Sequence, residues 1–128
     1  MITEFESATL KFLPWWEAFT AGRTLLEELD GIKHRVDGAL LLFAPESTTI
    51  VRRKKQAIPN LNVLFEFGYF YGHFGHDKVA VLKFGEFYLP SDLGGYVHIF
   101  GSKGFTRSSA RRINERTRTE LNRWLVRL

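Results

Sequence analysis

A single carboxylate, Glu66, lies inside a run of aromatic and glycine residues that extends from Asn62 to Gly75. A charged side chain among apolar neighbours costs about 2 kcal/mol or more when it has no partner, so this position requires an explanation. In one interpretation the run is an amphipathic helix and Glu66 is solvated on its polar face. In the other, that face lines a pocket, where a partly desolvated carboxylate is a candidate catalytic group. Periodicity alone favours the first interpretation.

Helical spacing divides this run into two stripes. The apolar stripe consists of Val63, Phe67, Phe70 and Phe74, and the polar stripe consists of Asn62, Glu66, Tyr69, His73 and His76. The two histidines lack a further ligand at suitable spacing, so we expect surface histidines and no metal site. Ser91 and Asp92 lack the context of a nucleophile elbow. Glu66 is therefore the strongest catalytic candidate among these residues.

Composition indicates one globular domain over residues 1–128. Hydrophobic residues make up 45% of the chain and include 12 Phe, which is ample for a buried core. The absence of cysteine excludes disulfides and thiolate metal sites. The longest apolar run, Ala39 to Pro45, is too short to span a bilayer, and the acidic N-terminus does not resemble a signal peptide. We expect a soluble cytoplasmic protein with no membrane contact.

The formal net charge of +4 is unevenly distributed. Seven arginines fall in the last 22 positions, and residues 52–55 form a second basic cluster. Such clusters could hold a phosphate backbone. No recognisable nucleic-acid-binding motif accompanies them. A solvated helix face and a surface loop are therefore the favoured interpretation, and no specific nucleic-acid partner is expected.

The remaining sequence predicts strands that alternate with helices. The expected strands are Ala8–Leu13, Val36–Phe43, Lys78–Phe84 and Tyr96–Phe100. The expected helices are Leu25–His34, one that begins at Asn62, and Ser109–Leu128. The expected loops include Trp15–Phe19, Glu46–Gln56 and Gly85–Gly95. Thr24 and Glu27 form a capping box before the first helix. Apolar runs such as Val36–Phe43 suit strands covered on both faces. The order predicts an α/β fold, doubly wound, with a mostly parallel sheet flanked by helices.

Ligands in such sheets bind beyond the carboxyl ends of the strands. The loop of Trp15 and Trp16, the loop with Ser91 and Asp92, and the start of the Glu66 helix all follow strand ends. We therefore expect Glu66 to face a cleft between these two loops. Trp15, Trp16 and Tyr69 could stack an aromatic ring of a ligand there.

Three motifs together resemble bacterial TIR-like domains, which include effector domains of cyclic-nucleotide-activated antiphage systems. They are WxxAFxxGxTL at residues 15–25, NVLFExGYFxGxFG at 62–75 and PSDLxG at 90–95. The resemblance covers nearly the whole chain, from about Ala8 to Leu128, and implies a TIR or flavodoxin-like fold. It implies cleavage of NAD+ at the nicotinamide–ribose bond, with NAD+ as substrate and no further cofactor. It also implies that Glu66 is the essential residue, and that Asn62, Trp15, Ser91 and Asp92 line the nucleotide site.

The chain departs from the family at its start, where relatives have a further strand, loop and helix before the region of Ala8. The expectation is therefore a TIR-like domain that lacks this first strand and helix. An inactive relative, a fragment, or a subunit completed by a homo-oligomer or an activating partner chain all fit this departure. Two other functions also stay open: a non-catalytic interaction module, and an enzyme similar to nucleoside deoxyribosyltransferases.

Overall fold

The computed structural model describes residues 5–7, 9–89, 98–100 and 115–128. Its helices are α1 (Trp15–Ala18), α2 (Leu25–Ile32), α3 (Leu61–Phe74), the short 3-10 helix η2 (His76–Lys78) and α4 (Glu115–Leu125). Its strands are β1 (Ala39–Phe43), β2 (Ser47–Val51), β3 (Lys54–Ile58), β4 (Val79–Lys83) and β5 (His98–Phe100). The prediction of a mixed α/β fold is confirmed.

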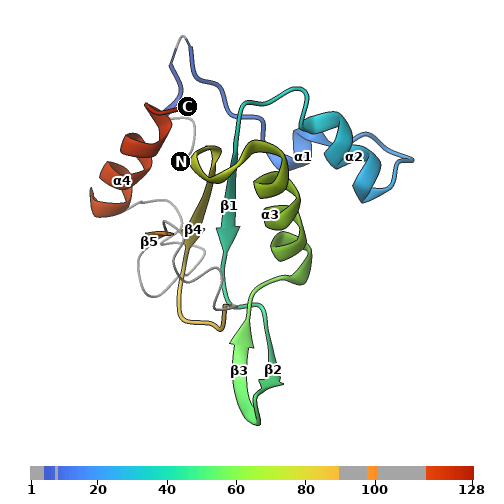
Figure 1. Cartoon of the computed structure of the whole chain (residues 1–128), viewed down its shortest axis with the longest axis vertical. Helices are drawn as coiled ribbons and strands as arrows, with labels where there is room; N and C mark the ends of the chain where they lie inside the picture. Colours follow the sequence, from blue (N-terminus) through green and yellow to red (C-terminus); the bar gives the residue numbers. More distant parts are fainter. Residues whose placement is uncertain (1–4, 8, 90–97, 101–114) are drawn as a thin grey trace.

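Strands β1, β4 and β5 form a small parallel sheet in the order β1-β4-β5 (Figure 1). The register pairs Ala39 with Val79 and Phe43 with Lys83. β4 is the central strand, and its residues 79–82 are buried, as the continuous apolar run predicts. The prediction of an interior strand is confirmed for β4, whereas β1 pairs with β4 alone within the described residues.

Two hydrophobic cores cover the two faces of this sheet. On one face, Leu41, Phe43, Val79 and Val81 pack with α2 and α3, together with Ala18 of α1. On the other face, Ala80 and Leu82 pack with Leu121, Trp124 and Leu125 of α4. The parallel sheet is thus flanked by helices, as predicted.

Local capping explains where the helices begin and end. The predicted capping box is present at α2, where the Thr24 side chain accepts from the Glu27 backbone N–H and Glu27 accepts from the Thr24 N–H. Asn60, and not Asn62, is the N-cap of α3, and its side chain accepts from the backbone N–H groups of Asn62 and Val63. Gly75 ends α3 with a φ of 82°, a left-handed conformation that glycine adopts without strain.

Two predictions in the N-terminal region were wrong. The described residues 9–13 form no strand, and Trp15–Ala18 form a helical turn rather than a loop. In the N-terminal segment Phe12 packs into the core under α4, whereas Leu13 packs into the core under α3. These side chains alternate between the two faces as they would in a strand, but within the described residues no neighbouring strand pairs with them. Pro14 then caps α1, because its carbonyl accepts from Glu17 and Ala18.

The predicted basic loop Glu46–Gln56 is instead the antiparallel hairpin β2–β3, which projects from the sheet (Figure 1). Its turn is made by Arg52 and Arg53, with φ values of 50° and 66°. Two-residue hairpin turns of this kind usually contain Asn and Gly, so the usual turn signal was missing from the sequence. The β-branched run from Thr48 to Val51 was the available signal.

The last predicted elements are described in part. β5 covers His98–Phe100 of the strand expected at Tyr96–Phe100, and α4 covers Glu115–Leu125 of the helix expected at Ser109–Leu128. The remaining residues of both lie outside the described ranges, apart from the last three of the chain. No helix in the described part of the chain is long and apolar enough to cross a membrane.

Candidate functional site

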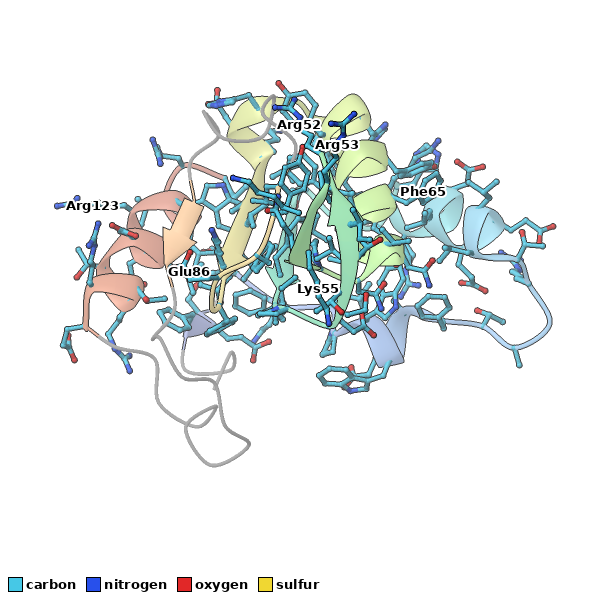
Figure 2. All side chains as sticks on the ribbon, turned by 90° about the horizontal axis from the view of Figure 1, so that it is seen from below. Arg52, Arg53, Lys55, Phe65, Glu86 and Arg123 are labelled. Carbon is cyan, nitrogen blue, oxygen red and sulfur yellow. The ribbon has the colours of Figure 1, made fainter. Side chains whose placement is uncertain are left out.

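Glu66 is buried in the structure, with only 7% of its surface exposed. It lies in the second turn of α3, next to Phe67, which belongs to the core beneath the helix. Within the described residues, its carboxylate has no hydrogen bond and no ion pair. The first interpretation of the sequence, a solvated Glu66 on an open helix face, is therefore wrong. The exposed residues of α3 include Leu61 and Phe65, which is labelled in Figure 2.

Glu28 provides a contrast within the same fold. It is also buried, at 3% exposure, but its Oε1 accepts a 3.0 Å hydrogen bond from the backbone N–H of Thr20. Glu28 therefore has a structural role, since it fixes the chain between α1 and α2. Glu66 has no such partner in the described residues, and its carboxylate oxygens are not among the fully buried atoms without a partner, so they keep contact with solvent. A mostly buried carboxylate that protein groups leave free to meet a ligand is a candidate functional group.

Burial raises the pKa of Glu66 above its usual range, because desolvation penalises the charged form. A neighbouring cation or hydrogen-bond donor would counter this effect. Desolvation is the only cause of the shift. The carboxylate, once ionised, is partly shielded from water and therefore interacts more strongly with a nearby positive charge than a carboxylate on the open surface does.

The flank of α3 that carries Glu66 faces α2. Tyr69, one turn further along the same flank, donates its hydroxyl to the Asp30 carboxylate of α2. Lys33 lies over the Tyr69 ring at 5.5 Å. His73, a further turn along, lies 6.1 Å from His34, ring centre to ring centre. Since residues 66, 69 and 73 share this flank, Glu66 lies on the side of α3 that the α1–α2 segment covers.

Aromatic side chains gather at the carboxyl ends of β1 and β4, and Phe67, the neighbour of Glu66 in the chain, is one of them. The ring of Phe43, the last residue of β1, lies 6.1 Å from Phe67 and 6.3 Å from Phe87. Lys83, the last residue of β4, places its Nζ 4.9 Å from the centre of the Phe87 ring. Sequence reasoning did not select Phe43, Lys83 or Phe87 as site residues. Their positions at strand ends were the signal that could have identified them.

The three residues predicted to stack a ligand ring lie on two helices, α1 and α3. Trp15 and Trp16 lie on α1, which packs on the same core as Phe67 through Ala18. Trp15 is 36% exposed and packs edge-on against Phe19 at 4.3 Å, and Trp16 is 77% exposed. Tyr69 is held against α2 by Asp30 and Lys33.

The remaining predicted residues are less constrained. Asn62 is exposed in the first turn of α3. Ser91 and Asp92, expected to form one wall of the cleft, lie outside the described residues. Among the residues that the structure describes, no group of three or more His, Cys, Asp or Glu side chains could hold a metal ion.

Comparison with known proteins identifies the family. Residues 2–102 match the model of the family described as CAP12/Pycsar effector protein, TIR domain. This match covers well over half of the chain and includes Glu66.

Three curated relatives show the same likeness. Protein YuaY of Escherichia coli K12 is 33% identical over 78 residues, which are 59% of this chain and 26% of that protein. CD-NTase-associated protein 12 of Sphingobacterium faecium is 32% identical over 114 residues, 85% of this chain and 34% of the relative. Pycsar effector protein PaPycTIR of Pseudomonas aeruginosa is 32% identical over 92 residues, which are 69% of this chain and 30% of that protein. The chain thus corresponds to about a third or less of each of these relatives.

Proposed function

Because this chain belongs to the CAP12/Pycsar effector TIR domain family, we propose that it cleaves NAD+ at the nicotinamide–ribose bond, with Glu66 as the essential residue. The observation that carries the proposal is the Glu66 side chain, which is 7% exposed and has no hydrogen bond or ion pair in the described residues. It precedes Phe67, whose ring lies 6.1 Å from that of Phe43 at the carboxyl end of β1. Family membership supplies the reaction class, and the local chemistry of Glu66 is compatible with it.

The proposed reaction needs one carboxylate rather than two. Nicotinamide is cationic in NAD+ and leaves as a neutral base, so no general acid has to protonate it, unlike the leaving group of ordinary glycosides. As the bond between the ribose C1′ and the nicotinamide nitrogen breaks, positive charge develops on the ribose. An ionised Glu66 would stabilise this oxocarbenium-like charge. Water then adds to C1′ and releases a proton, which gives ADP-ribose and nicotinamide.

The environment of Glu66 suits this role. A carboxylate that is partly desolvated has less water to lose when the ribose arrives, and its charge is less screened than at the open surface. No ion pair within the described residues competes with the substrate for it. Glu66 must be ionised to stabilise the ribose cation, and its pKa is raised by burial. The proposed activity therefore decreases as the pH falls through the pKa of Glu66.

Other residues would hold the rest of the nucleotide. We assign Trp15 and Trp16, with their exposed rings on α1, to contacts with the nicotinamide or adenine ring, and Asn62, Ser91 and Asp92 to polar contacts. Tyr69 would contact the nucleotide through the edge of its ring, because its hydroxyl group already donates a hydrogen bond to Asp30. The chain would act within an antiphage system, as a homo-oligomer or with an activating chain.

The test is incubation of the purified protein with NAD+, followed by chromatography for nicotinamide and ADP-ribose. We expect both products in equal amounts. A parallel incubation with a deoxynucleoside and a free base tests the deoxyribosyltransferase alternative, which predicts base exchange without NAD+. Base exchange with NAD+ left intact would contradict the proposal. If NAD+ binds to the concentrated protein but stays intact, the non-catalytic interaction module is the better account.

A further inference from the structure

The β2–β3 hairpin, Ser47–Ile58, forms an arm that projects beyond the carboxyl end of β1 (Figure 1). We call it the basic arm. Its base is fixed by backbone hydrogen bonds from Glu46 to Ile58, 3.0 Å, and from Tyr88 to Ala57, 2.8 Å. Its tip carries Arg52, Arg53, Lys54 and Lys55, all exposed. Figure 2 shows Arg52, Arg53 and Lys55 on the arm, with Arg123 on the distant α4.

The tip accounts for the net charge of the whole protein. The chain has 18 basic and 14 acidic residues. Without the four residues of the tip, the basic and acidic residues are equal in number, at 14 each. No acidic residue occurs between Glu46 and Glu66. The excess positive charge is therefore concentrated at one projecting point.

These four cations also lack internal partners. Across the described part of the chain, none of their side chains forms an ion pair or a hydrogen bond, although the backbones of Lys54 and Lys55 pair within the hairpin. The arginines of α4 differ: Arg116 pairs with Glu120 at 3.2 Å, and Arg118 lies 4.0 Å from Glu115. The cations of the arm are thus free to meet an anion from outside the protein.

The turn itself does not require arginine. Arg52 and Arg53 both have left-handed backbone conformations, which Asn and Gly adopt more readily. Two positive side chains occupy positions where they are conformationally unfavourable. Non-glycine residues in such conformations cluster at functional sites, which indicates that the charge of this turn has a use outside the fold.

We propose that the basic arm binds the phosphate backbone of duplex nucleic acid. A two-stranded ribbon has the width that the major groove of DNA admits. Hydroxyl groups of Ser47, Thr48 and Thr49 lie along the exposed strand β2 and can donate to phosphate oxygens. A protein partner fits less well, because its interface would call for large anchor residues. The arm has no aromatic residue, and Ile50 is its one exposed large apolar side chain within the described residues.

The test is the fluorescence anisotropy of a labelled mixed-sequence DNA duplex titrated with the full chain at several salt concentrations. If four phosphates are contacted, the logarithm of the DNA-binding constant should fall linearly with the logarithm of the salt concentration, with a slope of about −3.6. The double variant Arg52→Asn, Arg53→Gly removes two contacts while providing the preferred turn residues. We expect its affinity to fall about tenfold or more at low salt and its slope to become less steep by about 1.8, with no loss in Tm.

A charge-matched control removes the same number of cations elsewhere. Arg123→Gln in α4 with Arg127→Gln just after it removes two exposed positive charges at the C-terminal end, and should change the slope by less than about 0.5. Equal losses in both double variants would overturn the proposal, since only net charge would then matter. Equal competition by poly-glutamate and by unlabelled DNA would also overturn it and point to an acidic protein. If Arg52→Asn, Arg53→Gly unfolds, Lys54→Gln with Lys55→Gln gives the same comparison.

Discussion

At the residue scale, the two buried glutamates have different roles. Glu28 accepts a hydrogen bond from a backbone amide, whereas Glu66 has no partner in the described residues and a pKa raised by burial alone. In the sequence alone, the two residues look alike, since both are glutamates within predicted helices. Their difference arises from packing, because it depends on which elements cover each side chain.

The raised pKa of Glu66 predicts an effect on stability. The folded protein binds this proton more tightly than the unfolded chain, so Glu66 lowers the free energy of unfolding as the pH rises from about 4.5 through the folded pKa. Glu66→Gln removes the partly desolvated charge and should raise Tm at neutral pH. The gain should shrink toward zero below about pH 4.5, where wild-type Glu66 is protonated. Thermal melts of both proteins across this range test the sign; a gain that grows on acidification would contradict it.

Gly38 should not tolerate a side chain. A Cβ placed there would lie 2.5 Å from the carbonyl oxygen of Lys78 and 3.0 Å from Leu128. We expect Gly38→Ala to lower the free energy of unfolding by about 1–3 kcal/mol, since the backbone would have to shift. Gly68→Ala on the exposed side of α3 is the control: a Cβ there meets nothing within 4 Å, and alanine should stabilise the helix by up to about 1 kcal/mol. Denaturant titration measures both, and equal effects would refute this account.

At the element scale, the sequence was sufficient for elements whose signal is local. The capping box fixed the start of α2, and the continuous apolar run identified β4. The hairpin was missed because Arg52 and Arg53 lack the usual turn chemistry. The strand expected at Ala8–Leu13 was wrong because alternation describes how side chains are buried, not whether a neighbouring strand supplies hydrogen bonds.

The helix α4 should depend on Trp124. This side chain is 7% exposed, packs on the sheet with Leu121 and Leu125, and donates from Nε1 to the Asp77 carbonyl at 3.0 Å. Trp124→Ala should therefore lower the free energy of unfolding by about 3–5 kcal/mol.

Trp124→Phe should cost less than the alanine variant, because it keeps most of the packing and loses the hydrogen bond. Val126→Ala, at an 83% exposed position of the last turns, should be nearly neutral. Chemical denaturation of the three variants provides the comparison. A Trp124→Ala protein as stable as wild type would show that α4 does not pack as described.

At the scale of the whole molecule, the small parallel sheet flanked by helices that the sequence predicts is confirmed, while the residues assigned to the candidate site stay a prediction. Glu66 could be selected because it is the only carboxylate in an apolar helix. Phe43, Lys83 and Phe87 became visible only when β1, β4 and the following segment were placed side by side. Contacts between residues distant in sequence carry no local pattern, which is why sequence reasoning did not find them.

The central claim, that Glu66 enables cleavage of NAD+, is tested most directly by nicotinamide release from wild type, Glu66→Gln and Glu28→Gln under identical conditions. Glu28→Gln is the matched control, because a glutamine oxygen can still accept from Thr20. We predict that Glu66→Gln lowers the rate by about 100-fold or more while the fold is retained, since it removes the charge that stabilises the ribose cation, and that Glu28→Gln stays close to wild type. A Glu66→Gln protein that releases nicotinamide as fast as wild type would contradict the account.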